Sequence, residues 1–148
     1  HLDRVHVVQH DLLTGAPFAG DDVMLVDAPC SGLGTLRRDP DIRWKRAAGD
    51  LADFAQRQGR LLDSAAAALR PGGCLVYSTC SSEPDENDDV VRAFLARQPG
   101  YELEHPRQAE ATLPEAARAC LDPSGFLRTS PPAHGLEAFF AARLRRRA

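Results

Sequence analysis

Two cysteines and one aspartate follow apolar runs of the chain, at the points where buried strands would end. Asp27 and Cys30 belong to the stretch DAPCSGLG, which comes directly after Val23–Val26, and Cys80 closely follows Leu75–Tyr77. A thiol at the end of a strand acts as a nucleophile when its pKa falls below the free value of about 8.5. The pattern therefore predicts covalent catalysis by a cysteine, provided that both runs are neighbouring strands of one sheet.

A nearby carboxylate does not activate such a thiol, because a negative charge disfavours the thiolate. One possible source of activation is a group of arginines that follows the first motif, namely Arg37, Arg38 and Arg43. The other is the start of the helix expected after Ser82, whose backbone N–H groups favour an anion. The second source is the more economical, since the sequence alone places Cys80 just before that helix.

The remaining cysteines indicate neither a metal site nor a disulfide framework. The chain has four cysteines but no CxxC pair and no histidine at zinc-finger spacing, so we expect no metal. A disulfide framework is disfavoured in a chain of this size. For Cys74 and Cys120 we expect the role of small buried hydrophobic residues, which is also the structural alternative for Cys80.

Length and composition are those of one globular domain. The chain has 148 residues, 43% of them hydrophobic and 26% charged. No apolar run approaches the roughly 20 residues of a membrane span, and no signal peptide is visible, which predicts a cytoplasmic location. The net charge of −3 does not indicate a nucleic-acid-binding protein, although local charge decides docking. Because the sequence starts at His1, shortly before a strand-like stretch, we expect it to be part of a longer protein.

Apolar patterns predict alternating strands and helices. The predicted strands are Val5–Val8, Val23–Val26, Cys74–Tyr77, Tyr101–Glu104 and Phe139–Leu144. The predicted helices are Leu51–Leu69, which Pro71-Gly72-Gly73 would stop, and one capped by Ser82 with the apolar face Val90, Val91, Phe94 and Leu95. Residues 106–132 are expected to form loop with a short helix over Pro114–Cys120. This alternation predicts a doubly wound α/β fold with helices on both faces of a mostly parallel sheet.

In open sheets of this class, ligands bind in the crevice beyond the carboxyl ends of the strands. Four candidate residues are expected there: Asp11, Asp27, Cys30 and Cys80. Their convergence would place two thiols and two acids in one crevice. The structural alternative for the two aspartates is that they cap helices or turns, as aspartate often does after a strand.

The candidate residues lie in motifs that resemble the RNA (cytosine-5) methyltransferases of the Sun/Fmu family, of the ribosomal RNA small subunit methyltransferase B type. The motifs are DAPCSG at Asp27–Gly32, RDPDIRW at Arg38–Trp44, Gly72-Gly73, YSTCS at Tyr77–Ser81 and PDEN at Pro84–Asn87. The resemblance extends from about Val5 to the C-terminus. It implies a Rossmann-like class I methyltransferase fold, S-adenosylmethionine as methyl donor, and a cytosine in ribosomal or transfer RNA as acceptor.

The same resemblance implies a role for individual residues. Cys80 matches the nucleophile, and Cys30 matches the residue that assists release of the methylated product. Asp27 matches the acid near both the cofactor and the target base, and Asp11 matches the acid that contacts the adenine part of the cofactor. Pro29 lies between Asp27 and Cys30 in the cofactor-binding motif and would fix the directions of both side chains.

These roles agree with the chemistry of the reaction. Carbon 5 of cytosine is too electron-poor to attack a sulfonium methyl unaided, so a thiolate must first add at carbon 6. A carboxylic acid beside the ring relieves the resulting charge at N3, which suits Asp27 if burial raises its pKa. The carbon 5 proton must then leave and the thioether must break, and Cys30 or a water can promote both steps.

A basic cluster follows the first motif and is a candidate RNA-binding surface. Its members are Arg37, Arg38, Arg43, Lys45 and Arg46. We expect these side chains to contact the RNA backbone, with Trp44 packed against the core or a base. The structural alternative is a solvated charged face.

The sequence departs from the family in one respect. It has no glycine-rich cofactor loop after a first strand and no following acid to hold the ribose, and Gly72-Gly73 precedes a strand instead of following one. We therefore expect residues 1–148 to be the C-terminal portion of one catalytic domain, to lack the first two strands of its sheet, and to bind the cofactor poorly when isolated. Two alternatives stay open: a non-catalytic RNA-binding relative, and an amino-methylating enzyme, which would have no need of Cys80.

Overall fold

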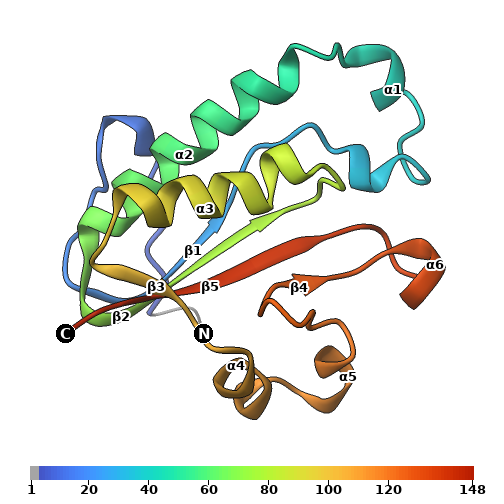
Figure 1. Ribbon diagram of the computed structural model, residues 1–148. Coiled ribbons are helices and arrows are strands. Elements are labelled where there is room, and N and C mark those ends of the chain that lie inside the picture. The colour runs from blue at the N-terminus through green and yellow to red at the C-terminus, as the bar shows by residue number, and fades with distance from the viewer. Residues whose placement is uncertain (1–3) are drawn as a thin grey trace.

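The computed structural model describes residues 4–148, which form one mixed sheet with helices packed on it (Figure 1). The sheet contains β1 (Asp21–Asp27), β2 (Leu69–Thr79), β3 (Tyr101–Leu103), β4 (Leu127–Arg128) and β5 (Phe140–Arg146). Its order is β1-β2-β5-β3, and β4 also pairs with β5. β1 and β2 are parallel, whereas β5 is antiparallel to β2, β3 and β4. Four strands therefore run in one direction and β5 alone is reversed.

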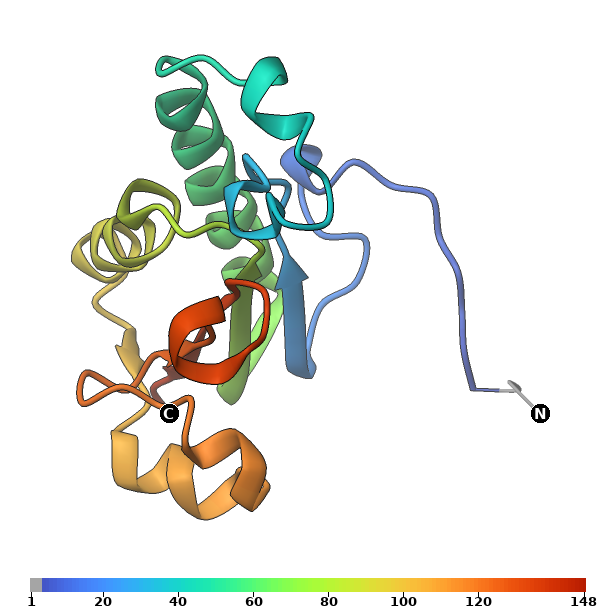
Figure 2. The ribbon, with the colours of Figure 1, turned by 90° about the vertical axis from the view of Figure 1, so that its right-hand side faces the viewer.

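Two long helices cover one face of this sheet (Figure 2). Helix α2 (Asp50–Ala68) is the crossover between β1 and β2, and α3 (Asp88–Arg97) follows β2. The helical period predicted for Leu51–Leu69 is confirmed, because Leu61, Leu62 and Ala65 are buried against the sheet. The helix ends before Pro71-Gly72-Gly73, which belong to β2 instead of forming a stop.

The core lies between these helices and the sheet. Tyr77, Phe94, Leu144 and Phe140 are almost completely buried. The Phe94 ring packs edge-to-face on Tyr101 at 5.3 Å, and the Tyr77 ring packs on Phe140 at 6.2 Å. The predicted strands at Tyr101 and Phe139–Leu144 are confirmed as β3 and β5.

Short helices occupy the connections. They are the 3₁₀ helices η1 (Leu12–Thr14), η2 (Leu33–Thr35) and η3 (Pro84–Glu86), and the α-helices α1 (Ile42–Lys45), α4 (Pro106–Thr112), α5 (Glu115–Arg118) and α6 (Pro131–His134). The segment from α4 to β4 lies against the face of the sheet opposite α2 and α3. There it encloses an apolar cavity of about 150 Å³ lined by Val76, Leu113, Leu121 and Ala141.

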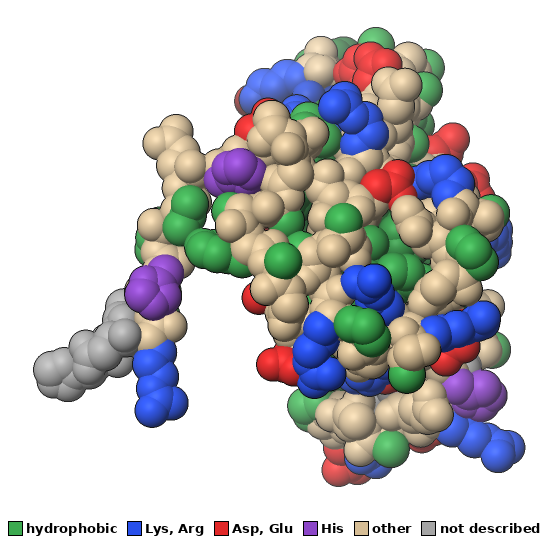
Figure 3. Space-filling model, turned by 90° about the vertical axis from the view of Figure 1, so that its left-hand side faces the viewer, with side chains coloured by type: hydrophobic (Ala, Val, Ile, Leu, Met, Phe, Trp, Pro, Cys, Tyr) green, Lys and Arg blue, Asp and Glu red, His purple; other side chains and the backbone are tan. Residues whose placement is uncertain are grey.

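Two predicted elements are wrong. Residues 5–8 form no strand, and Figure 3 shows the segment next to the grey atoms standing away from the body. The reason is that a strand requires a hydrogen-bonding neighbour, and no described strand lies beside this segment. Ser82 caps no helix, because its hydroxyl donates to Glu83 (2.8 Å) and α3 begins later, after Asn87.

One face of β1, the face that carries Val23 and Leu25, is also uncovered among the described residues. Val23 and Leu25 are 64% and 68% exposed, whereas Val26 is buried under α2. The apolar run 23–26 was predicted to be covered on both faces, and in this structure α2 covers one. None of the described helices is both long and apolar enough to cross a membrane.

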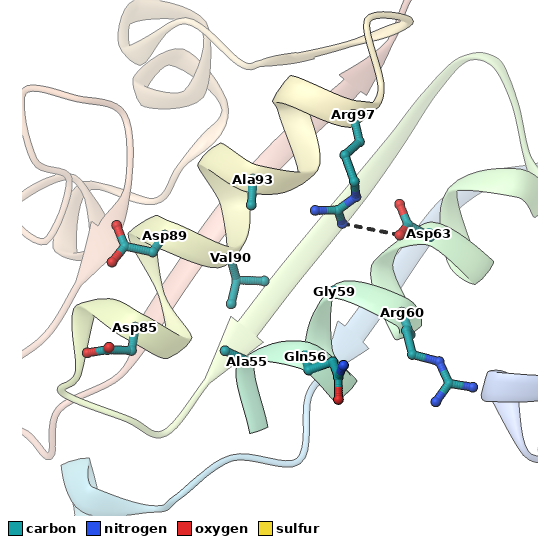
Figure 4. Close-up of a pocket in the computed structure, with 10 residues that line it drawn as sticks. All are labelled: Ala55, Gln56, Gly59, Arg60, Asp63, Asp85, Asp89, Val90, Ala93 and Arg97. Carbon is teal, nitrogen blue, oxygen red and sulfur yellow. Dashed lines mark hydrogen bonds and ion pairs between the residues drawn. The ribbon is translucent and has the colours of Figure 1, made fainter. Parts of the chain in front are cut away.

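A groove of about 420 Å³ separates the outer sides of α2 and α3 (Figure 4). Arg97 reaches across it to form an ion pair with Asp63 at 3.1 Å, and Asp85 and Asp89 line its other end. None of the residues that line this groove is among the predicted site residues.

Phe94→Ala tests the placement of the core. Loss of a fully buried ring leaves a cavity under α3 and should lower the free energy of unfolding by ~3–5 kcal/mol. Urea denaturation of the protein measures this change. Phe18→Ala is the matched control, since Phe18 is 57% exposed, and it should cost less than about 0.5 kcal/mol. Equal effects of both variants would contradict the described core.

Candidate active site

The structure brings the two predicted catalytic cysteines into contact. Their sulfur atoms lie 3.3 Å apart, and both side chains are partly accessible. Cys30 follows β1 and Cys80 follows β2, and these parallel strands pair Asp27 with Ser78. Because parallel strands end at the same edge of a sheet, the two loops leave the sheet side by side. The predicted convergence of Cys30 and Cys80 is thus present.

Asp27 lies at the same edge but is not buried. Its carboxylate is exposed and accepts a hydrogen bond from the Ser78 hydroxyl at 3.1 Å. The burial expected for Asp27 is not present in this structure, since β1 is the edge strand of the described sheet. The carboxylate is open to a ligand at the strand end.

The pair of thiols is asymmetric. Burial, followed by the hydrogen bond and the charge of Cys80, raises the pKa of the Cys30 thiol to about 12. Cys30 therefore keeps its proton at neutral pH and can donate the hydrogen bond between the two sulfurs. A thiolate at Cys80 would receive this bond, which is a source of stabilisation that the sequence did not indicate.

The two sources of activation predicted from the sequence are not adjacent to Cys80. Helix α3 starts at Asp88, after the separate turn η3, so its N-terminus does not directly follow Ser82. Arg37 forms an ion pair with Glu137 at 3.0 Å instead. Arg38 and Arg43 are exposed.

A buried carboxylate joins the two cysteine loops. Glu86 in η3 is fully buried, and its oxygens accept four hydrogen bonds. Oε1 accepts from the Ser31 backbone N–H at 2.8 Å and from Gln58 Nε2 at 3.0 Å. Oε2 accepts from the hydroxyls of Ser31 at 2.5 Å and Ser81 at 2.6 Å. Ser31 and Ser81 each come directly after one of the cysteines, so Glu86 holds both loops.

Two amide side chains extend this network. Gln58 Nε2 also donates to the Pro29 carbonyl at 3.0 Å. Asn87 accepts from the Thr79 hydroxyl at 2.5 Å and donates to the Ser81 carbonyl at 2.9 Å. The residues on both sides of each cysteine are therefore fixed by buried partners.

Gly34 brings the loop after Cys30 against the other loop. Its N–H donates to the Cys80 carbonyl at 3.0 Å, and its carbonyl accepts from the Ala138 N–H at 3.0 Å. A Cβ at this position would lie 2.8 Å from the Cys80 oxygen. Only glycine allows this approach without moving the backbone.

The three predicted cofactor-binding residues are exposed and do not share one role. Asp11 caps η1 by accepting from the Leu13 N–H at 3.0 Å, which is the structural alternative foreseen for it. Asp27 and Pro29 stand at the carboxyl end of β1 with open side chains. This edge fits one wall of a ligand site, as expected for an α/β sheet.

The basic cluster divides into bound and open side chains. Arg46 donates to the Ser31 carbonyl at 2.9 Å and lies over the Phe54 ring, so it supports the Cys30 loop. Arg43 lies over the Trp44 ring at 5.0 Å. Trp44 is 78% exposed, so packing of Trp44 against the core is wrong. Arg38, in the connection between η2 and α1, and Arg43 and Lys45, on α1, remain exposed.

Sequence reasoning missed the residues of the buried network. Gln58 lies on the buried face of α2, one helical turn before Leu61 and Leu62, and a polar residue at that position was a usable signal. Glu86 and Asn87 belong to the PDEN motif after Cys80, and the sequence alone assigns this motif no role. Their partners Ser31 and Ser81 carry no such signal.

Comparison with known proteins gives consistent matches. The family described as 16S rRNA methyltransferase RsmB/F matches residues 2–145. Ribosomal RNA small subunit methyltransferase F of Cronobacter sakazakii is 44% identical over 127 residues, which are 86% of this chain and 26% of the relative. Methyltransferase B of Klebsiella pneumoniae is 52% identical over 82 residues, which are 55% of this chain and 19% of the relative.

The solved structure of NSun6 from Pyrococcus horikoshii with SFG has a similar fold. It has a TM-score of 0.78 and 28% sequence identity, and the match covers 97% of this chain and 35% of NSun6. This likeness confirms the predicted Rossmann-like methyltransferase fold. The chain spans only about a fifth to a third of the relatives that it matches.

The asymmetry of the thiols predicts an order of alkylation. The raised pKa of Cys30 leaves little thiolate there at pH 8, and the thiolate is the form that iodoacetamide attacks. Cys80 should therefore be modified before Cys30, as measured by mass spectrometry of the digested protein over time. The buried Cys74 thiol, in a residue only 5% exposed, is the internal control and should react last. Labelling of Cys30 first would contradict the assignment of donor and acceptor.

Proposed function

The chain belongs to the RsmB/F family of 16S rRNA methyltransferases, and we propose that it carries the catalytic thiols for methylation of cytosine carbon 5 in RNA. The contact between the sulfurs of Cys30 and Cys80 at 3.3 Å is the observation that supports this proposal most. Methylation of carbon 5 needs one thiol to form an adduct and a second group to help undo it. The proposed substrate is ribosomal or transfer RNA.

In the first step, the Cys80 thiolate adds to carbon 6 of the target cytosine. A carbon–sulfur bond forms, and the electron pair of the carbon 5–carbon 6 double bond moves toward N3 of the ring. The S–H of Cys30 supports the thiolate before the attack by a hydrogen bond. The exposed carboxyl of Asp27 stands at the same sheet edge as a candidate partner for N3.

S-adenosylmethionine, when bound, supplies an electrophilic methyl group to carbon 5. Asp27 and Pro29 would line its site at the end of β1, and Asp11 would contribute if it exchanges its bond to the Leu13 N–H for one to the ligand. We propose that residues 1–148 alone bind this cofactor poorly, because the sequence lacks the glycine-rich cofactor loop that follows the first strand in the family.

Release of the product requires loss of the carbon 5 proton and cleavage of the carbon–sulfur bond. Once the Cys80 sulfur is bound in a thioether, it carries no charge. Two of the causes that raise the pKa of Cys30 are then removed, namely the charge of Cys80 and its hydrogen bond as a thiolate. The pKa of Cys30 should fall at that stage, which makes its thiol a better acid–base group when one is needed.

The basic cluster is the proposed contact with the RNA backbone. Arg38, Arg43 and Lys45 are exposed and follow the Cys30 loop in the chain. Arg37 and Arg46 hold parts of the protein through Glu137 and Ser31, so we assign them a smaller share of RNA binding. The exposed Trp44 ring is available for stacking on a base.

The other function classes explain the pair of thiols less well. A non-catalytic RNA-binding relative has no need for two thiols in contact at a strand edge. An amino-methylating enzyme of the same fold has no need for Cys80. Methylation of RNA by the protein would exclude the first, and mapping of the methyl group to carbon 5 would exclude the second.

Serine substitutions of the two cysteines test the proposed chemistry. Cys80→Ser should lower methyl transfer by roughly a thousandfold or more, because an alcohol is a poor nucleophile for carbon 6. Cys30→Ser should allow addition and methyl transfer but slow release, so that protein accumulates covalently on RNA. Radiolabelled methyl transfer and denaturing gel electrophoresis of the complex measure both. Unchanged activity of Cys80→Ser would disprove the mechanism.

Charge removal tests the proposed RNA contact. The double variant Arg43→Ala/Lys45→Ala should weaken RNA binding and reduce the slope of log K against log salt by about 0.7 for each lost phosphate contact. Filter binding across a salt series measures this slope. The control is Arg60→Ala/Arg92→Ala, which removes the same charge from α2 and α3. A larger effect of the control would place the RNA elsewhere.

A further inference from the structure

We infer that Glu86 is a positioning residue, whose buried carboxylate sets the distance between the sulfurs of Cys30 and Cys80. The relevance of this distance to methyl transfer rests on the proposed function. The contacts of Glu86 with the two loops do not depend on that function. Glu86 touches neither sulfur. It acts through Ser31 and Ser81, which follow the two cysteines in the chain.

The carboxylate is suited to hold two loops at once. It offers two oxygens with two acceptor sites each, and the four donors fill these sites. The loop of Cys30 supplies two donors through Ser31, and the loop of Cys80 supplies one through Ser81. Gln58 supplies the fourth and ties the network to α2. Among side chains, only the carboxylate of Asp or Glu offers four acceptor sites on one group.

Complete burial makes this arrangement rigid. Glu86, Ser31 and Ser81 have at most 1% of their surface exposed, so water does not compete for these bonds. A missing bond would leave a donor unsatisfied in the interior, which the fold disfavours. The two loops are therefore held in one relative position.

The backbone of η3 is held by contacts that do not involve the Glu86 side chain. The Tyr77 hydroxyl donates to the Glu86 carbonyl at 2.6 Å, and Asn87 bonds to Thr79 and to the Ser81 carbonyl. Both Tyr77 and Thr79 belong to β2. Glu86 is thus anchored to the strand that leads to Cys80 and reaches across to the loop of Cys30, which determines how closely the two thiols approach.

The spacing of the thiols can be measured with phenylarsine oxide, without RNA or cofactor. The arsenic forms one bond to each of two thiol sulfurs, the oxygen leaves as water with both thiol protons, and arsenic keeps its oxidation state. Tight binding requires two thiols held close together. Cys30→Ser in the protein should lose this binding and thereby identifies the pair that is measured.

The test compares the protein with the variants Glu86→Ala, Glu86→Gln and Glu104→Ala. Glu86→Ala should weaken binding of phenylarsine oxide by at least about tenfold, because the effective concentration of one thiol near the other falls. It should lower kcat of RNA methylation by about 100-fold through misplacement of the sulfurs, with KM for RNA changed less than about threefold. Glu86→Gln should keep most of the arsenical affinity and most of kcat. The oxygen of the Gln side chain can accept from Ser31 and Gln58, while its nitrogen donates to the hydroxyls of Ser31 and Ser81.

Glu104→Ala is the matched control. Glu104 is 6% exposed and pairs with Arg143 and Arg145 on β5, away from the cysteine loops. Its loss also removes a buried carboxylate, but it should leave arsenical affinity and kcat unchanged. A thermal unfolding curve for each variant separates the general loss of stability from the change of spacing.

If Glu86→Ala does not fold, Ser31→Ala/Ser81→Ala tests the same contacts while leaving the carboxylate in place, and it should weaken arsenical binding in the same direction. Wild-type arsenical affinity in either folded variant would overturn the inference. If the affinity falls but Cys80→Ser transfers methyl groups to RNA as fast as the unsubstituted protein, the inference on spacing stands and the proposed function fails.

Discussion

Parallel pairing of β1 with β2 is the constraint on which the site depends. Two strands that run in the same direction end at the same edge, so the loops after them begin side by side. The register that pairs Asp27 with Ser78 brings the Cys30 loop level with the Cys80 loop. A shift by one residue would turn the side chains of one strand to the opposite face and separate the thiols. The contact between the sulfurs thus depends first on the register of β1 and β2, and only then on the chemistry of the side chains.

The surroundings of Cys30 raise the pKa of its thiol, first of all through burial. Two sulfurs in contact do not both carry a negative charge, because each thiolate disfavours the other. Burial and the contact with Cys80 raise the pKa of Cys30, so Cys30 keeps its proton at neutral pH and can donate it to the contact. The asymmetry agrees with the separate tasks that the family resemblance implies. Its origin lies in the surroundings of Cys30, since both residues have the same side chain.

The sequence was sufficient for the strands and helices whose apolar residues face the core, such as α2 and β5. It was also sufficient for the convergence of Cys30 and Cys80, because strand ends and motifs are local features. It failed for Val5–Val8, where a strand pattern has no described neighbour to pair with. The network around Glu86 was not predictable, because its four donors come from three separate segments and their meeting depends on tertiary packing.

The same network places a buried carboxylate beside the cysteine loops. Glu86 contacts Ser31 and Ser81, the residues that follow the two cysteines. Its field reaches other groups, since burial and then the charge of Glu86 raise the pKa of Tyr77.

The basic segment after the first motif also contacts this network. Arg46 bonds to the carbonyl of Ser31, the residue that also gives Glu86 two of its hydrogen bonds. A positive charge is thereby fixed beside the loop that the carboxylate holds. Because this guanidinium is bound to the protein, it supports the Cys30 loop, whereas Arg38, Arg43 and Lys45 of the same segment stay exposed.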